Sequence, residues 1–278
     1  MVKIAFYNST MCVRGTSVAL FDYAKYSQEI LKNESIIITP VARLSDCDLR
    51  GLTHFMQNFI VKTHTDLDDL DRILLEEKCD MLYVIKFGNN DGILSKKVKT
   101  VIHCVFDMSQ PHGDVYAGVS HTLAAKFGKT LFVPHMVSIE PDFSDNWRRE
   151  LNIPENAIVF GRSGGPDTWN LSFSWEVIFE VLAETQNIWF LFINTIIPCH
   201  PRIICLPKVT ENKEKSKFIA TCDAGMELGT MGHTFGLNLA EFSIHNKPLV
   251  IYKPEPVSFA LEQCTSRYFR SQRGCTLL

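Results

Sequence analysis

The sequence predicts an α/β protein with two successive halves, each built on a parallel sheet. Apolar strand-like runs alternate with helical segments along the 278 residues, which is typical of parallel sheets. The alternation stops at an irregular polar stretch near residue 140 and then resumes. In each half, the first strand runs into a glycine turn and then a helix. We therefore expect domains at residues 1–140 and 141–278.

The elements of the first half follow in order. The first strand covers residues 3–7, and a loop containing Gly15 leads to a helix for which Ser17 is a suitable N-cap. Residues 49–61 have helical spacing, and residues 68–78 form a helix with acids in its first turn. A short helix follows at 120–128. The remaining strands are expected at 35–41, 81–87, 99–107 and 130–136.

The second half begins with a strand at 157–163 that enters the glycine-rich turn Gly161-Arg162-Ser163-Gly164-Gly165. A helix at 174–186 and strands at 188–194 and 202–207 follow. The apolar helix after Gly236 then leads to a strand at 246–252. From about residue 256 we expect an irregular tail.

Composition limits the class of protein. With 46% hydrophobic and 21% charged residues, the chain is globular and has enough apolar mass for real cores. A net charge of −3 provides no footprint for nucleic acid. Nine cysteines without a CxxC spacing favour reduced thiols in the cytoplasm. No apolar run approaches the roughly 20 residues of a membrane span, and the first strand takes the place of a leader peptide.

The most informative stretch is 231–242, MGHTFGLNLAEF, where Glu241 is the single acid on an apolar helix. An unpaired buried charge costs several kcal/mol, so this carboxylate needs a partner. On a continuous helix, His233 would lie about 12 Å away along the axis and roughly 80° around it. The two groups would then hold opposite ends of an elongated polar ligand. A core helix with a glycine-rich lead-in is the alternative, but it does not explain Glu241.

Two glycine turns are suited to anions, because free N–H groups at a helix N-terminus point toward negative charge. The first contains Gly15 beside Arg14, and the second contains Gly161, Arg162 and Gly164. Neither turn has the GxGxxG spacing of a dinucleotide fingerprint. Ordinary tight turns between strand and helix remain the alternative.

The 231–252 stretch resembles the donor-site signature of group 1 (family-four-like) retaining glycosyltransferases with the GT-B fold, in which two glutamates flank seven residues. Thr234, Phe235, Gly236 and Glu241 match the signature, whereas His233 stands where the first glutamate belongs. The resemblance implies two Rossmann-like domains whose parallel sheets face each other across a cleft, with a shortened C-terminal domain. It also implies that Glu241 contacts the ribose and that His233 occupies the place of the sugar contact.

Gly161-Arg162 resembles the family's Gly-Arg pair, whose arginine binds the donor diphosphate and stabilises the leaving group. The lysine that usually follows is absent, because Asp167 and Thr168 occupy that neighbourhood, and Lys86 or Lys208 are possible substitutes. The expected donor-binding set is Gly15, Gly161, Arg162, Gly164, His233, Thr234, Phe235, Gly236 and Glu241.

Arg162, His233 and His112 are the expected catalytic residues. His233 is predicted at a helix N-terminus, where the helix dipole favours a neutral imidazole. His112 lies on an irregular loop of the first half, where the family often places a His or Asp near the reacting hydroxyl; a solvated loop histidine is the alternative. His112, Asp114 and His121 lack a recognisable metal-ligand spacing, so no metal site is expected.

The resemblance implies an enzyme that moves a hexose from a nucleotide-diphosphate sugar to an acceptor hydroxyl with retention, without metal or cofactor. An inert nucleotide-sugar-binding protein derived from such an enzyme is the alternative, and an epimerase of the same fold is a third. The sequence identifies neither the donor nor the acceptor, which could be a glycan, lipid or protein.

The amino-acid sequence most resembles those of short glycosyltransferases of large DNA viruses and some bacteria. This resemblance implies a cytoplasmic location, which is the host cytoplasm if the chain is viral. Residues Cys275–Leu278 loosely match a prenylation box, which leaves peripheral membrane contact open.

Overall fold

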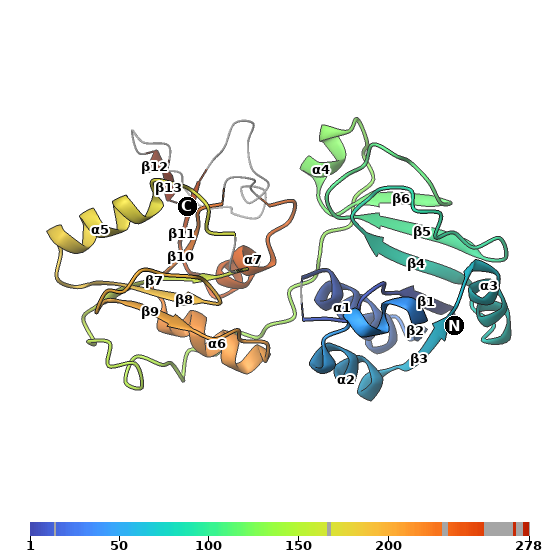
Figure 1. Ribbon diagram of the computed structural model, residues 1–278, viewed down its shortest axis with the longest axis horizontal. Coiled ribbons are helices and arrows are strands. Elements are labelled where there is room, and N and C mark those ends of the chain that lie inside the picture. Colours follow the sequence, from blue (N-terminus) through green and yellow to red (C-terminus); the bar gives the residue numbers. More distant parts are fainter. Residues whose placement is uncertain (14, 166–167, 230–232, 253–268, 271–274, 278) are drawn as a thin grey trace. The chain divides into compact units, whose positions relative to one another are not determined.

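The protein, seen in a computed structural model, divides into two compact units, Met1–Met136 and Val137–Leu278 (Figure 1). The structure describes residues 1–13, 15–165, 168–229, 233–252, 269–270 and 275–277. The division falls just before the boundary expected at residue 140. Each unit is a mainly parallel sheet covered by helices, so the predicted α/β class is confirmed.

Unit 1 is a six-stranded parallel sheet in the order β3-β2-β1-β4-β5-β6. This order places β1 beside both β2 and β4, as in doubly wound dinucleotide-binding folds. The elements are β1 (Lys3–Tyr7), α1 (Gly15–Glu29), β2 (Glu34–Pro40), a 3-10 helix η1 (Val41–Asp46), α2 (Leu49–Asn58), β3 (Ile60–His64), α3 (Leu67–Glu76), β4 (Met81–Lys86), β5 (Lys99–Cys104), β6 (Val115–Gly118) and α4 (His121–Lys126).

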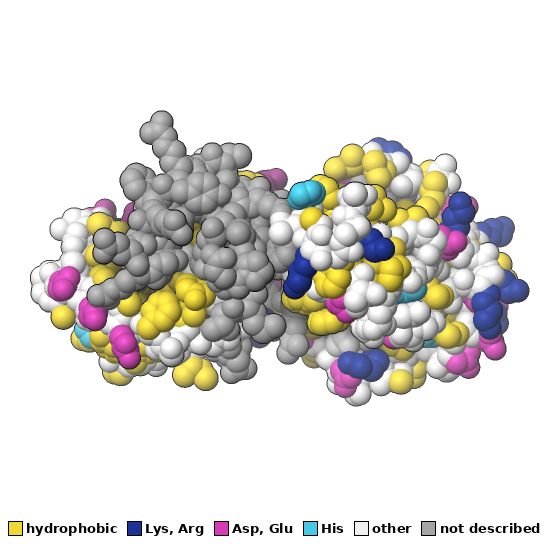
Figure 2. Space-filling view, turned by 90° about the horizontal axis from the view of Figure 1, so that it is seen from above, with side chains coloured by type: hydrophobic (Ala, Val, Ile, Leu, Met, Phe, Trp, Pro, Cys, Tyr) yellow, Lys and Arg dark blue, Asp and Glu magenta, His cyan; other side chains and the backbone are white. Residues whose placement is uncertain are grey.

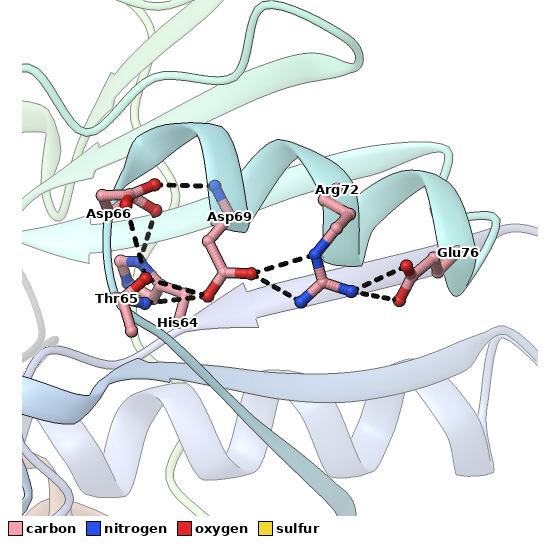
Figure 3. Close-up of polar contacts among 6 residues, drawn as sticks. All are labelled: His64, Thr65, Asp66, Asp69, Arg72 and Glu76. Carbon is pink, nitrogen blue, oxygen red and sulfur yellow. Dashed lines mark hydrogen bonds and ion pairs between the residues drawn. The ribbon is translucent and has the colours of Figure 1, made fainter.

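Polar side chains determine where α3 begins (Figure 3). The Asp66 carboxylate caps the helix by accepting a hydrogen bond from the backbone N–H of Asp69 at 2.8 Å. Along the exposed face, Arg72 lies between Asp69 and Glu76 and pairs with both. The predicted helix with acids in its first turn is therefore confirmed. The acids serve to cap it and to interact with its dipole.

Three expectations for unit 1 are wrong, and one strand was not expected. Ser17 is not an N-cap, because α1 already begins at Gly15; its hydroxyl instead donates to the Thr10 carbonyl at 2.9 Å. The helix expected to reach residue 61 ends at Asn58, and β3 follows. The short strand β6 was not predicted. Residues 130–136 do not form a strand, because the segment is joined to β6 only by an isolated bridge between Phe132 and Gly118.

Unit 2 is a seven-stranded sheet in the order β12-β13-β11-β10-β7-β8-β9. The five strands from β11 to β9 are parallel, and β13 adds antiparallel pairs at the edge. The elements are β7 (Ile158–Ser163), α5 (Ser174–Glu184), β8 (Ile188–Ile193), β9 (Ile203–Leu206), α6 (Asn212–Thr221), β10 (Ala224–Glu227), α7 (Leu237–Ile244), β11 (Leu249–Tyr252), β12 (Phe269–Arg270) and β13 (Cys275–Leu277). The tail expected to be irregular from residue 256 therefore contains two short strands.

Helices cover both faces of the unit 2 sheet, with α5 on one side and α6 on the other (Figure 1). One core includes Phe218 of α6 and Phe242 of α7 against β7 and β8. The other includes Ile178 of α5 and Trp169 against Phe192. A strand buried on both faces has to be almost wholly apolar, which explains the run IWFLFI in β8.

The surface of unit 1 carries Lys and Arg side chains beside Asp and Glu side chains (Figure 2). Several form exposed pairs, including Arg72 with Glu76 and Arg43 with Asp46. Among the described residues, no helix has both the length and the apolar character needed to cross a bilayer.

Candidate functional site

In unit 2, the polar residues Arg162, Ser163 and Glu227 lie where the order of the strands reverses. From β7 the chain proceeds to β8 and β9 on one side, and then crosses to β10 on the other side of β7. Ligands of open α/β sheets bind outside the carboxyl ends of the strands at such a switch point. Arg162 and Ser163 end β7, and Glu227 ends β10.

Arg162 is a buried arginine with only 1% of its surface exposed. Its Nη1 donates to the Thr195 hydroxyl at 2.7 Å, and its Nη2 donates to the Thr168 hydroxyl. The guanidinium carbon lies 5.4 Å from the centre of the Trp169 ring. Burial lowers the pKa of the guanidinium, and the Glu227 carboxylate opposes this effect. The side chain is thus held as a fixed cation at the end of β7.

Two expected donor-binding glycines have steric reasons to be glycine. A Cβ added at Gly164 would lie 2.4 Å from Nη2 of Arg162, so the turn passes directly beside the guanidinium. A Cβ at Gly161 would lie 2.2 Å from the Cys222 sulfur, where β7 packs on α6. Asn194, just after β8, supports the turn by donating to the Gly164 carbonyl at 3.1 Å.

Among the described residues, Glu227 is the carboxylate that pairs with Arg162. Its side chain is 4% exposed, with Oε1 at 3.7 Å from Nη2 of Arg162 and at 3.4 Å from Nε2 of His233. Oε2 accepts from Nδ2 of Asn238 at 2.8 Å. Burial raises the pKa of this carboxyl, but His233, Arg162 and Asn238 outweigh burial and hold the pKa below its usual value. Glu227 is therefore an ionised buried carboxylate.

The lead-in to α7 contains His233, Thr234, Phe235 and Gly236. Gly236 caps the helix with φ +79°, a left-handed conformation that glycine adopts without strain. Since α7 begins at Leu237, the helical spacing expected between His233 and Glu241 is wrong, and His233 does not lie at the helix N-terminus itself. Its imidazole is partly exposed and faces Glu227.

Glu241 has a partner of its own. Its Oε1 accepts from Nζ of Lys215, in the first turn of α6, at 2.8 Å. Both side chains are largely buried. The carboxylate that faces Arg162 is Glu227 rather than Glu241, so Arg162 and Glu241 have different charged partners.

In unit 1, His112 is 8% exposed, which differs from a solvated loop residue. Its Nδ1 lies 2.6 Å from the Gln110 carbonyl, and its Nε2 lies 3.3 Å from Nζ of Lys86. These contacts fit a neutral ring that is protonated on Nδ1 and accepts at Nε2. Lys86 also pairs with Asp91. Gly15 is the first residue of α1, whereas Arg14 lies outside the described residues, as does Asp167.

The structure brings together Arg162, Gly164 and His233 from the predicted set, and adds Glu227, Asn238, Thr168 and Thr195. Glu227 was not predicted, because β10 is a four-residue strand, AGME, which gives little apolar signal. A lone acid just before a glycine-rich loop was the available indication.

No family model and no curated protein matches the chain, whereas solved structures match it. The structure of HepE from Anabaena in complex with UDP and glucose is 15% identical, with a TM-score of 0.69 over 96% of this chain and 84% of that one. A glycosyltransferase from Rickettsia africae is 13% identical, with a TM-score of 0.66 over 95% and 82%. WaaG, a glycosyltransferase involved in lipopolysaccharide biosynthesis, is 11% identical, with a TM-score of 0.58 over 94% and 88%.

The chain has the GT-B fold. The two parallel α/β units satisfy the expected class, and the likeness extends over nearly the whole chain. At these identities the comparisons show the architecture, so the role of each residue depends on the site itself.

Proposed function

We propose that this protein is a glycosyltransferase that transfers a hexose from a nucleotide-diphosphate sugar to an acceptor hydroxyl. The observation that carries the proposal is the buried cation Arg162 at the switch point of unit 2, with Glu227 and His233 beside it. A fixed cation there suits a diphosphate whose charge grows as the glycosidic bond breaks. HepE, which has the same fold, binds UDP-glucose.

Three finer features belong to the proposal. Transfer proceeds with retention, the leaving diphosphate is stabilised by protein groups rather than a metal, and the enzyme works in the cytoplasm. Their support is the resemblance of residues 231–252 and of Gly161-Arg162 to group 1 retaining enzymes. Gly15, Thr234, Phe235 and Glu241 complete the proposed donor site, and His112 is the proposed contact near the acceptor hydroxyl.

One observation favours an inert nucleotide-sugar-binding protein instead. The Arg162 guanidinium donates to the Thr168 and Thr195 hydroxyls and pairs with Glu227. A diphosphate has to compete with these partners. Of the three guanidinium nitrogens, Nε is the one that has no hydrogen bond within the described residues.

A donor screen with purified protein separates the two functions. Thermal shifts with UDP-glucose, UDP-galactose, UDP-N-acetylglucosamine and GDP-mannose identify the donor, because a ligand of the folded state raises its stability. Release of the nucleoside diphosphate then measures hydrolysis or transfer, with and without EDTA. Turnover that EDTA does not change supports the enzyme. Binding without turnover supports the inert protein, and no binding contradicts both.

A further inference from the structure

We propose that Glu227 is the carboxylate that receives a hydroxyl group of the donor sugar, in place of the acid that is absent at position 233. The inference rests on the proposed function and adds to it a residue that the signature does not contain. His233 lies beside this carboxylate, with its Nε2 at 3.4 Å from Oε1.

One oxygen atom of Glu227 has unused capacity to accept hydrogen bonds. Oε1 of Glu227 is buried, yet it has no hydrogen-bond partner within the described part of the chain. Its charged neighbours, Arg162 and His233, lie at 3.7 and 3.4 Å. A buried carboxylate oxygen is normally saturated by donors, so an open acceptor position indicates a ligand hydroxyl or a water.

The Glu227 carboxylate, and with it Oε1, is held in place. Asn238 donates from Nδ2 both to Oε2 of Glu227 at 2.8 Å and to the Ser163 carbonyl at 2.9 Å. The amide thus ties the end of β10 to the end of β7 and fixes the plane of the carboxylate. The geometry leaves Oε1 as the oxygen that faces the switch point. A sugar acceptor that is fixed before the ligand arrives loses little freedom on binding.

His233 stands at the position where the group 1 signature has an acid, and this replacement is compatible with Glu227. The group 1 signature places an acid there, and a second carboxylate beside Glu227 would repel it at close range. An imidazole is compatible with Glu227, because it carries no negative charge; its Nε2 lies 3.4 Å from Oε1. The His233 side chain is 30% exposed, whereas that of Glu227 is 4% exposed. The departure from the signature at 233 is therefore matched by an acid that the strand next to Arg162 supplies.

Glu241 is a poorer candidate for this place, because its Oε1 pairs with Nζ of Lys215 at 2.8 Å and the carboxylate that faces Arg162 is Glu227. Trp169 Nε1 and Arg162 Nε are two further buried atoms without a hydrogen bond in the described residues, and both belong to side chains beside Glu227 or Arg162. Two buried donor atoms and one buried acceptor atom, all without a hydrogen bond in the described residues, thus lie at one end of the sheet.

The test compares UDP with UDP-glucose, the nucleotide sugar bound to HepE, by titration of tryptophan fluorescence. In Glu227→Gln the amide oxygen turns to the Asn238 donor, which puts an NH₂ group where Oε1 was. We expect the ratio of the Kd for UDP-glucose to the Kd for UDP to rise about ten- to a hundredfold, since a hydrogen bond to a charged group is lost. UDP affinity does not fall, because Arg162 is released toward the diphosphate.

Asp223→Asn is the matched control. Asp223 lies at the opposite end of β10 and also pairs with an arginine, Arg148, at 2.7 Å. We expect this variant to lose stability without a change in the Kd ratio. An equal loss of UDP and UDP-glucose affinity in Glu227→Gln would mean a merely structural role and would overturn the inference.

A double variant tests the exchange between the two positions. His233→Glu alone places two carboxylates together and should weaken UDP-glucose binding, whereas His233→Glu combined with Glu227→Gln restores one carboxylate and should recover it. Failure of the double variant to recover, in protein whose circular dichroism matches the wild type, contradicts the inference. Wild-type protein that binds neither UDP nor UDP-glucose contradicts the proposed function for this donor instead.

Discussion

Gly164 allows the backbone after β7 to pass beside the Arg162 guanidinium. A methyl group there would meet Nη1 at 2.8 Å and Nη2 at 2.4 Å. The guanidinium cannot move away easily, because Thr168 and Thr195 hold it and Trp169 covers it. The absence of one side chain therefore decides where the cation of the proposed donor site lies.

We predict that Gly164→Ala displaces Arg162 and lowers donor turnover at least tenfold, with a loss of stability of about 1–3 kcal/mol. Nucleotide release and urea denaturation measure the two effects. Gly165→Ala is the control, because its Cβ would meet only the Thr168 side chain, at 3.3 Å or more. Equal turnover in the two variants would contradict this account of Gly164.

At the scale of elements, two histidines are buried between α1, β5 and the segment that follows α4. The hydroxyl of Tyr83, on β4, lies 2.6 Å from Nδ1 of His103. The hydroxyl of Tyr23, on α1, donates to the Pro134 carbonyl at 2.7 Å. The ring of His135 lies 5.6 Å from that of His103. Burial lowers the pKa of His103 to about 4 and that of His135 to about 3, and in His135 the neighbouring His103 adds to the effect.

These shifts predict that the protein loses stability in mild acid. Between pH 6.5 and 4 the unfolded histidines bind protons that the folded ones do not, so the free energy of unfolding is full above pH 6.5 and falls as the pH drops. We expect a loss of about 2 kcal/mol for each histidine between pH 7 and pH 5. Urea denaturation followed by circular dichroism measures it.

His135→Asn should reduce this pH dependence, whereas His121→Asn, which changes an exposed histidine at the start of α4, should leave it unchanged. The same slope in His135→Asn and in the wild type would show that His135 does not titrate in this way.

The entry to α7 is a second prediction at this scale. Gly236 has φ +79°, and a Cβ there would meet Leu239 Cδ1 at 3.1 Å. We expect Gly236→Ala to cost about 1–2 kcal/mol and Gly236→Asn to cost less, since asparagine tolerates the left-handed region. Urea denaturation gives both values. A larger cost for asparagine than for alanine would contradict the conformational explanation.

At the scale of the whole molecule, the two units have separate cores and different optical probes. All four tryptophans, Trp147, Trp169, Trp175 and Trp189, belong to unit 2. Trp169 also packs against Arg162. Tryptophan fluorescence therefore reports on the unit that contains the proposed donor site, whereas circular dichroism reports on both units.

We predict that UDP at about 100 times its Kd stabilises unit 2 by about 2.7 kcal/mol. The melting transition observed by tryptophan fluorescence should then move to higher temperature, and Arg162→Lys should reduce the shift because the lysine lacks the planar fork that binds phosphate. If UDP raised only the transition seen by circular dichroism, its binding site would lie in unit 1.

Much of the fold was predictable because local patterns and tertiary structure agree. Apolar runs such as those of β1, β4 and β8 are buried on both faces, and the acids at the start of α3 cap that helix. The errors occur where pairing partners decide. β3, β6 and β10 are short strands without a strong apolar signal, and neighbouring strands stabilise them.

By itself, the sequence determined that this chain forms two α/β halves. It identified Glu241 as a carboxylate that needs a partner, and Arg162 and His233 as candidate site residues. Only the tertiary structure decided which partners they have: Glu227 lies beside Arg162 and His233, whereas Lys215 neutralises Glu241. The reason is physical. The order of strands in a sheet brings the ends of β7 and β10 together across 64 residues of chain, from Ser163 to Glu227, and no local pattern encodes that contact.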